Sequence, residues 1–165
     1  MKNQNTKSKT AICAGSFDPP TLGHLNIIER GLQIFDKLIV AVATNTAKKP
    51  ILDVGERISL LKELLKNHKN IEVTTFEGLL INFAKGRKIT TLLRGIRNMS
   101  DYEYESQMAL VNKALYPELE TVFMMTEGKY SHLRSTFIKE ILLAGGSCKG
   151  MIHPLVEKKL KERLK

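Results

Sequence analysis

Short apolar runs alternate along the chain with segments whose apolar residues recur every three or four positions. Five runs have the length and character of strands: 10–14, 38–43, 71–76, 89–95 and 121–125. The run 38–43 contains no polar residue, which is typical of a strand covered on both faces. Helical spacing fills the stretches between the runs, as at Leu25, Ile28, Leu32 and Phe35. The pattern therefore predicts strands that alternate with helices.

Capping signals indicate where several of these helices begin. Two pairs have the spacing of a capping box, Asp53 with Glu56 and Ser100 with Glu103, and each precedes a helical pattern. A short helix is expected over 79–85. A further helix is predicted from Ser135 to Leu143, because Gly145 follows it and glycine commonly ends helices.

Alternating strands and helices pair their strands in parallel through right-handed crossovers. We therefore expect an α/β fold with a doubly wound, Rossmann-like parallel sheet of five strands. Residues 10–165 are expected to form one domain. The polar residues 1–9 precede it as a tail that we expect to be disordered. Such sheets bind ligands beyond the carboxyl ends of their strands, so the segments that follow each strand are the candidate site.

The first strand is followed by GSFDPPTLGH, residues 15–24. His24 falls in the first turn of the next helix, where free N–H groups and the helix dipole attract phosphate. The helix start lowers the pKa of a histidine, and a bound polyphosphate would raise it again. A lone histidine here is most often a half-buried structural residue. The rigid loop, Gly23 and the strand-end position favour a functional role for His24.

The other strand ends add cationic and hydroxyl groups. They are Lys48 and Lys49 after the second strand, Leu80 after the third, Arg94 and Arg97 after the fourth, and Ser131, Ser135 and Thr136 after the fifth. Each group has a plainer interpretation: solvated lysines, a core leucine, arginines paired with Asp101, Glu103 or Glu105, and an N-cap at Ser135. The sequence contains no Walker motif, no GxGxxG and no nucleophile with an obvious base. We therefore expect a site that binds and stabilises phosphates and forms no covalent intermediate.

Three segments closely resemble the bacterial phosphopantetheine adenylyltransferases, a family of the nucleotidyltransferase superfamily with a T/HxGH motif. They are GSFDPPTLGH, LLRGIRNMSDYEYE (92–105) and YSHLRSTFIKE (130–140). The T-x-G-H of residues 21–24 indicates only the superfamily, and the middle segment is the more specific. The resemblance implies an enzyme that transfers the adenylyl group of ATP to 4′-phosphopantetheine, giving dephospho-coenzyme A and pyrophosphate in coenzyme A biosynthesis. It also implies Mg²⁺ as cofactor and a homohexamer.

The resemblance assigns residues to roles by their match to the family's motifs. His24 is the catalytic residue implied, contacting the ATP phosphates and stabilising the transition state. The positions that match ATP-binding residues are Ser16, Phe17, His24, Gly95, Ile96, Arg97, Glu105, Tyr130, Ser131, His132, Leu133, Arg134, Ser135 and Thr136. The positions that match phosphopantetheine-binding residues are Ser16, Lys48, Leu80 and Arg94. No protein side chain is assigned to a metal. Ser16 and Arg134 depart from the family, which usually has threonine and a small hydroxyl residue there.

Composition narrows the range of binding partners that we expect. The 165 residues carry a net charge of +9, which favours anionic ligands. Part of this excess lies in EKKLKERLK at the C-terminus, which is most simply a solvated helix face. Cys13 and Cys148 lack metal or disulfide spacing, so we expect reduced thiols in a cytoplasmic protein. No apolar run approaches the roughly 18 residues of a membrane span.

Two alternatives remain open at the level of sequence. One is a different adenylyl- or cytidylyltransferase of the same superfamily, which the T-x-G-H motif alone does not exclude. The other is a basic nucleic-acid-binding module, which the net charge supports. The absence of any known nucleic-acid motif argues against it. We expect neither nucleic acid nor membrane as a partner.

Overall fold

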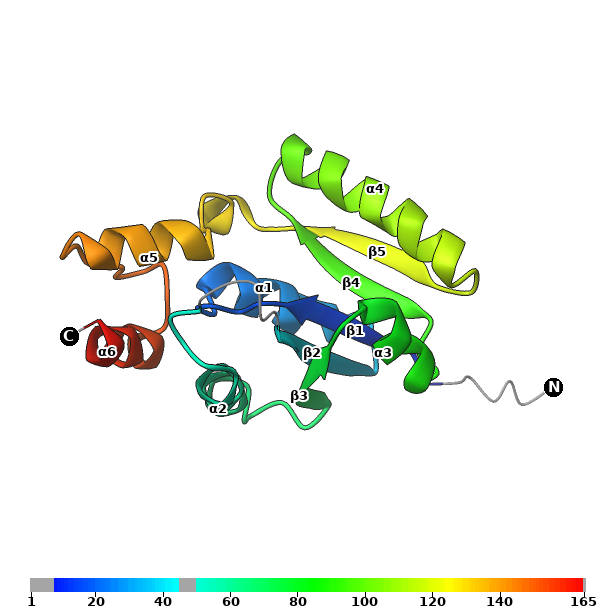
Figure 1. Cartoon of the computed structure of the whole chain (residues 1–165), viewed down its shortest axis with the longest axis horizontal. Coiled ribbons are helices and arrows are strands. Elements are labelled where there is room, and N and C mark those ends of the chain that lie inside the picture. The colour runs from blue at the N-terminus through cyan, green and yellow to red at the C-terminus, as the bar shows by residue number, and fades with distance from the viewer. Residues whose placement is uncertain (1–7, 45–49, 165) are drawn as a thin grey trace.

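Five parallel strands form one sheet in the order β3-β2-β1-β4-β5 (Figure 1). The computed structural model describes residues 8–44 and 50–164. The strands are β1 (Thr10–Gly15), β2 (Lys37–Thr44), β3 (Ile71–Glu77), β4 (Thr91–Ile96) and β5 (Glu120–Met125). The strand order reverses between β1 and β4, which makes the sheet doubly wound, as predicted. This reversal is the point where sheets of this kind bind ligands.

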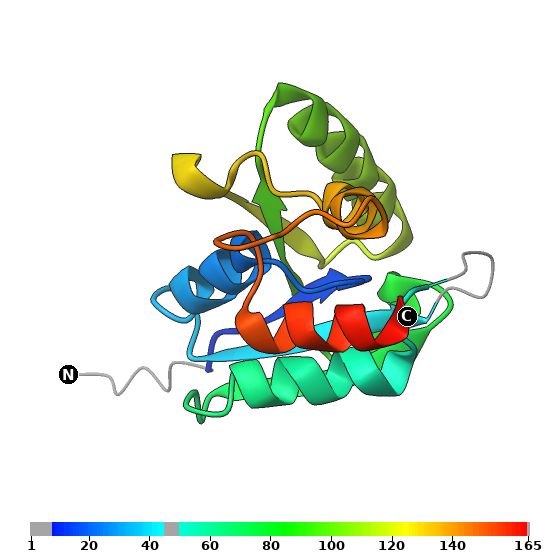
Figure 2. The same ribbon diagram turned by 90° about the vertical axis from the view of Figure 1, so that its left-hand side faces the viewer.

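Helices cover both faces of the sheet and its carboxyl edge. They are α1 (Leu22–Gly31), α2 (Val54–Leu64), α3 (Leu80–Gly86), α4 (Met99–Leu115), α5 (Ser135–Leu143) and α6 (Pro154–Arg163), with a 3₁₀ turn η1 (Gly128–Tyr130) before α5. Helices α1 and α2 cover one face, and α3 and α4 lie on the other (Figure 1). Helices α5 and α6 lie beyond the carboxyl ends of the strands, and α6 runs alongside α2 (Figure 2).

Three apolar clusters hold these layers together. One joins the sheet to α1 and α2 through residues such as Val40, Ile28 and Leu61, all fully buried. A second lies between the opposite face and α3. The third, which includes Leu52, Ile138 and Leu160, binds α5 to α6 and to the segment before α2. Helix α5 therefore packs in an apolar cluster that lies beside the sheet and is separate from the two clusters on its faces.

Two of the predicted helix starts are capped differently from the sequence expectation. The Asp53–Glu56 capping box is confirmed at α2. The Ser100–Glu103 box is wrong: Asn98 is the N-cap of α4, and its side chain accepts from the backbone N–H of Asp101. Ser135 is the first residue of α5, as predicted, but it caps nothing. Its hydroxyl instead donates to the carbonyl of Pro19 at 2.9 Å.

The two ends of the domain also differ from expectation. Lys9, assigned to the tail, is held next to β1: its backbone N–H donates to the carboxylate of Asp36, and its carbonyl accepts from the backbone N–H of Asp36. The C-terminal helix is more than a solvated face. Val156 and Leu160 are fully buried, and Arg163 hydrogen-bonds Glu56 of α2. That bond to Arg163 is the main reason that the pKa of Glu56 falls to about 2.

Within residues 8–44 and 50–164, no helix combines the length and the apolar character needed to cross a bilayer.

Candidate active site

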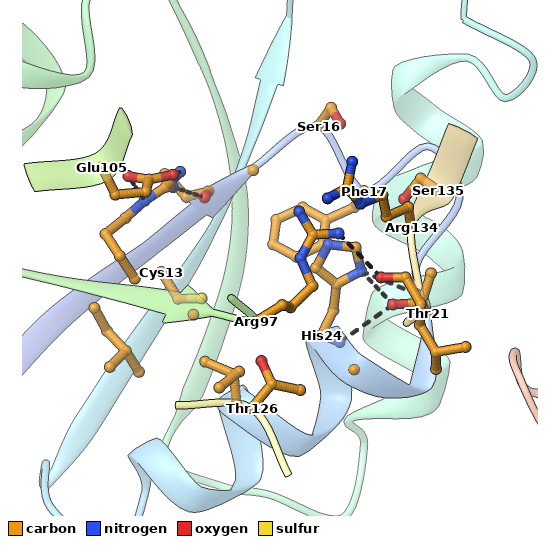
Figure 3. Close-up of a pocket in the computed structure, with 18 of the residues that line it drawn as sticks. Cys13, Ser16, Phe17, Thr21, His24, Arg97, Glu105, Thr126, Arg134 and Ser135 are labelled. Carbon is orange, nitrogen blue, oxygen red and sulfur yellow. Dashed lines mark hydrogen bonds and ion pairs between the residues drawn. The ribbon is translucent and has the colours of Figure 1, made fainter. Parts of the chain in front are cut away.

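A cavity of about 430 Å³ opens where the carboxyl ends of β1 and β4 meet α5 (Figure 3). We call it the nucleotide cavity, after the ligand that the sequence predicts for the residues that line it. Its lining comes from four segments: the loop from β1 to α1, the end of β4, Glu105 of α4, and the segment that enters α5. The predicted site residues among the lining are Ser16, Phe17, His24, Arg94, Gly95, Arg97, Glu105, Leu133, Arg134, Ser135 and Thr136. Segments far apart in the chain therefore meet at the predicted strand edge.

The loop from β1 to α1 is shaped by Phe17. This residue has a φ of 47°, in the left-handed region that non-glycine residues rarely adopt. Its ring is only 1% exposed and packs edge-on against the imidazole of His24, with ring centroids 5.1 Å apart. Ser16 beside it is exposed at the cavity wall. Phe17 thus turns inward to pack on His24 and leaves Ser16 exposed at the cavity.

His24 is part of a capping box at the start of α1. Its backbone N–H donates to the hydroxyl of Thr21, and its Nδ1 lies 3.0 Å from the backbone nitrogen of Thr21. Because that N–H can only donate, Nδ1 accepts, and the neutral ring carries its proton on Nε2. Burial is the main cause that lowers the pKa of His24 to about 4, and the guanidinium groups of Arg97 and Arg94 add to it. The predicted direction of the shift is confirmed, although burial is its main cause. At neutral pH the site holds a neutral imidazole.

Arg94 at the end of β4 forms a bidentate ion pair with Glu105 of α4. Its third contact is the carbonyl of Ala14, the penultimate residue of β1. The plainer interpretation of Arg94, a pairing with a local carboxylate, is therefore what the structure contains. The pair still lines the nucleotide cavity and a second cavity described below. Arg94 and Glu105 thus stand at the boundary between two ligand-sized spaces.

Arg97 is held in the same way, by Asp101 and by the carbonyl of Leu133 at 3.1 Å. Leu133 lies in the segment that enters α5, so this bond ties the end of β4 to α5. Arg134, where the family usually has a small hydroxyl residue, places its guanidinium 5.5 Å from the ring centre of Phe137. Three arginines and one carboxylate line the nucleotide cavity among its described residues. The balance suits an anionic ligand.

Gly95 is required for packing. A Cβ atom there would lie 2.9 Å from a side-chain carbon of Ile27 in α1, closer than real contacts allow. Only glycine lets α1 approach β4 this closely, and α1 carries His24.

A second cavity of about 740 Å³ adjoins the first and lies between α3 and α4. We call it the acceptor cavity. Apolar side chains predominate in its lining: Phe76, Leu79, Leu80, Ile81, Leu92, Met108, Val111 and Leu115. Leu80, predicted either as core or as an apolar ligand wall, lines this cavity and is half-buried. The cavity is mainly apolar, with the Arg94–Glu105 pair among its polar lining residues.

Several predicted residues lie elsewhere. Ile96 is 1% exposed and lies outside the lining, although its carbonyl accepts from the backbone N–H of Thr126. Tyr130, Ser131 and His132 also fall outside it. Lys48, like Lys49, lies outside the residues that the structure describes. For Ile96, Tyr130, Ser131, His132 and Lys48, a binding role remains a prediction from the resemblance.

Sequence reasoning missed two buried charged residues next to the site. Asp18 is 5% exposed, and its carboxylate accepts from the backbone N–H groups of Ile51 and Leu52. Arg57 of α2, also 5% exposed, donates to the carbonyls of Ser16 and Ala43. The backbone groups named here are 33 and 34 residues from Asp18 and 41 and 14 residues from Arg57, so no local sequence pattern indicates these contacts. One feature of the sequence does point to Asp18: it is a charged residue between Phe17 and two prolines, and a charged residue that is buried needs a polar partner.

The described residues contain no group of three or more His, Cys, Asp or Glu side chains that could hold a metal ion. Glu105, the carboxylate of the nucleotide cavity, is already occupied by Arg94. These residues do not fit a resident metal site.

Comparison with known proteins shows the family to which the chain belongs. The cytidylyltransferase-like family model matches residues 12–141. A protein of Caldanaerobacter subterraneus subsp. tengcongensis named phosphopantetheine adenylyltransferase is 49% identical over 157 residues, which cover 95% of this chain and 98% of that protein. Relatives with the same name from Clostridium botulinum and Carboxydothermus hydrogenoformans are 49% and 47% identical, each over 94% of this chain and over 95% and 96% of their own.

A solved structure from Vibrio parahaemolyticus, described as a nicotinate-nucleotide adenylyltransferase, matches 96% of this chain and 95% of its own with a TM-score of 0.69. Its sequence identity is 21%, so this likeness concerns the fold alone. The sequence relatives go further, because they match at nearly half of all positions over almost the whole chain. The chain belongs to the phosphopantetheine adenylyltransferase family, within the cytidylyltransferase-like nucleotidyltransferases.

Proposed function

We propose that this enzyme transfers the adenylyl group of ATP directly to the phosphate of 4′-phosphopantetheine, releasing pyrophosphate and forming dephospho-coenzyme A. The observation that supports this most strongly is the pair of adjoining cavities, one lined by arginines and a helix start, the other of about 740 Å³ and mainly apolar. ATP and phosphopantetheine have the charge and the polarity that these two linings suit. A polyphosphate suits the first cavity, and a phosphate on a flexible, weakly polar arm suits the second.

In this proposal ATP occupies the nucleotide cavity with its phosphates at the start of α1. The positive end of the α1 dipole would attract the phosphate oxygens, and the exposed hydroxyl of Ser16 and the Nε2–H of His24 would donate to them. The start of α5, with Ser135 and Thr136, would supply backbone amides from another part of the lining. The neutral His24 donates a hydrogen bond without carrying a fixed charge, and its pKa would rise when the polyphosphate is bound.

The acceptor would place its arm along Leu80 and the apolar residues of α4, with its phosphate at Arg94. Arg94 would then exchange part of its contact with Glu105 for the incoming phosphate. The geometry supports this role because the guanidinium already reaches the boundary of both cavities. Lys48, which follows β2 in the sequence, remains a second predicted ligand of the same phosphate.

The chemistry needs no protein base. An oxygen of the acceptor phosphate, anionic at neutral pH, attacks the α-phosphorus of ATP. The new P–O bond forms as the bond from the α-phosphorus to the bridging oxygen breaks, and pyrophosphate takes the electron pair. What the protein must supply is in-line placement and stabilisation of charge that develops on the leaving group. Arg94 can serve the first need, and His24 with the start of α1 the second.

Mg²⁺ enters this account as part of the substrate. Because the described residues do not fit a resident metal site, we propose that the ion arrives on the phosphates of ATP. We also propose a cytoplasmic enzyme, since Cys13 and Cys148 are free, buried thiols of the kind found in reducing compartments.

The proposed homohexamer has support in α4. Of its 17 residues none is buried, and Met99, Leu110 and Val111 are 70%, 73% and 51% exposed. A large exposed apolar helix face marks an interaction surface. Light scattering at micromolar concentration tests this: a sixfold chain mass supports the hexamer, and a monomer mass refutes it.

The reaction itself is tested by pyrophosphate release from ATP and Mg²⁺ with a panel of acceptors. We expect 4′-phosphopantetheine to be used and the product to have the mass of dephospho-coenzyme A. Nicotinamide mononucleotide and glycerol phosphate should be poor acceptors. If either is used faster, the enzyme is another nucleotidyltransferase and this proposal is wrong.

A further inference from the structure

The buried carboxylate of Asp18 lies behind the wall of the nucleotide cavity. Its side chain is 6% exposed and accepts from the backbone nitrogens of Ile51 at 3.2 Å and Leu52 at 3.0 Å. It also forms an ion pair with Lys139 of α5, whose side chain is 25% exposed. Asp18 follows Phe17, so this carboxylate joins the loop that supports His24 to two other parts of the chain.

Lys139 and Ser135 lie four residues apart in α5, and residues so spaced share one helix face. Ser135 donates to the carbonyl of Pro19, and Lys139 pairs with Asp18. One face of α5 therefore contacts two consecutive residues of the loop from β1 to α1. That loop and the start of α5 both line the nucleotide cavity, so these contacts join two parts of its wall.

Apolar packing links α5 to the sheet only indirectly. Ile138 and Leu142 of α5 belong to a cluster shared with α6 and α2, and the cluster that holds α1 to the sheet contains no residue of α5. The described polar bonds from residues 133–143 to the sheet side of the cavity are the Asp18–Lys139 pair, the Ser135–Pro19 bond and the Arg97–Leu133 bond. The direct polar contacts between this segment and that side are thus few.

The charge of Lys139 also matters for the ligand. Asp18 places a negative charge close behind a site that is to receive a polyphosphate, and its burial leaves little water to screen that charge. Lys139 neutralises it without entering the cavity lining.

We propose that Asp18 and Lys139 are positioning residues: their partly buried ion pair holds the first turn of α5 against the loop from β1 to α1, so that Ser135, Thr136 and His24 face one nucleotide. Neither side chain touches the substrate. The inference rests on the proposed adenylyl transfer for its kinetic test, and on the fold alone for its structural test.

The kinetic test compares Lys139→Met with Lys139→Arg. Methionine keeps an unbranched apolar stem and removes the charge, whereas arginine restores a cation. We expect Lys139→Met to lower kcat by roughly 10- to 100-fold, as misplacement of bound groups does, with a near-normal KM for phosphopantetheine. Lys139→Arg should recover most of the rate. The matched control is Lys37→Met, which removes an ion pair with Glu72 at the amino end of β2 and should leave kcat within about twofold.

All rates are taken per folded molecule, at a temperature where circular dichroism shows each variant to be folded. A merely structural pair predicts a lower melting temperature and an unchanged kcat, and that result would overturn the inference. Equal loss in Lys139→Met and Lys37→Met, or failure of Lys139→Arg to recover activity, would overturn it as well.

Hydrogen exchange separates failure of this inference from failure of the proposed reaction. In Lys139→Met the hydrogen-bonded amides of residues 138–142 and the amides of the non-proline residues in the loop at 16–21 should exchange faster than in the wild type and in Lys37→Met. This holds even if the wild-type enzyme adenylylates another acceptor. Unchanged exchange in both segments would contradict the positioning role.

Discussion

The Nδ1 atom of His24 lies 3.0 Å from the backbone nitrogen of Thr21, and this contact fixes the state of the imidazole. The Thr21 N–H donates, so the ring proton is on Nε2. His24 therefore combines two roles that the sequence presented as alternatives. It helps to cap α1, as a structural histidine would, and it keeps a free N–H donor for a phosphate. The two roles can be separated by substitution.

We predict that His24→Ala lowers the single-turnover rate by about 10²–10³, the loss seen when one preorganised transition-state donor is removed. Ground-state affinity for ATP, measured by calorimetry, should change little. The lost cap should cost about 1 kcal/mol of the free energy of unfolding.

The control is His24→Gln, because glutamine at this helix position can still bond the N-cap backbone. It should recover the stability and leave the rate low. A fully active His24→Ala enzyme would show that the imidazole has only the capping role.

The low pKa of His24 predicts how stability depends on pH. The folded enzyme holds the pKa at about 4, below the value of 6.5 expected for the unfolded chain. Above pH 6.5 the ring is neutral in both states, and its contribution is fully present. As the pH falls from 6.5 to 4, the unfolded state takes up a proton that the folded state refuses, so stability falls by up to about 3 kcal/mol.

Urea unfolding at several pH values checks this, with His24→Gln as the reference. The wild type should lose more stability than the variant over this window. Parallel curves for the two proteins would show that the imidazole titrates normally in the folded state.

Arg94→Ala should weaken use of phosphopantetheine more than binding of ATP. The substitution removes a predicted phosphate ligand and leaves the Glu105 carboxylate unpaired at the boundary of the two cavities. Arg94→Lys should restore little, since a lysine cannot make the bidentate contact. Titration calorimetry with each ligand separates the effects. Equal losses for both ligands would place Arg94 outside the acceptor site.

Leu80→Ala should raise the KM for phosphopantetheine by about tenfold, the factor that corresponds to 1.4 kcal/mol of lost apolar burial. The KM for ATP should stay close to the wild-type value, because Leu80 lines only the acceptor cavity of the two. Ile34→Ala serves as the control, since Ile34 is 53% exposed and lies outside both cavities. An unchanged KM for both substrates in Leu80→Ala would show that the arm of the acceptor binds elsewhere.

Local sequence patterns predicted the helices and strands correctly where the spacing of apolar residues alone determines which side chains are buried. The run at Leu38–Ala43 became β2, buried on both faces, and Asp53 with Glu56 capped α2 as their spacing predicts. The Ser100–Glu103 spacing failed because Asn98 precedes it. An asparagine side chain accepts from a backbone N–H three residues ahead as well as serine does, and it starts the helix earlier.

The site was harder to predict where its contacts join distant segments. Strand ends were enough to bring His24, Arg94 and Ser135 into one cavity, because parallel strands end at one edge. The hydroxyl of Ser135 instead bonds Pro19, 116 residues away. The partners of Asp18 and Arg57 are likewise fixed only by tertiary packing, so their roles emerge with the structure.

The central claim is a direct transfer from ATP to the acceptor phosphate, and one measurement tests it most directly. The wild-type enzyme is mixed in excess with ATP radiolabelled at the α-phosphate, Mg²⁺ and 4′-phosphopantetheine, and a single turnover is quenched at intervals. The account predicts that label passes from ATP to dephospho-coenzyme A at a single rate and that none is bound to protein at any time. Label trapped on the protein before product forms, or no labelled dephospho-coenzyme A at all, would contradict it.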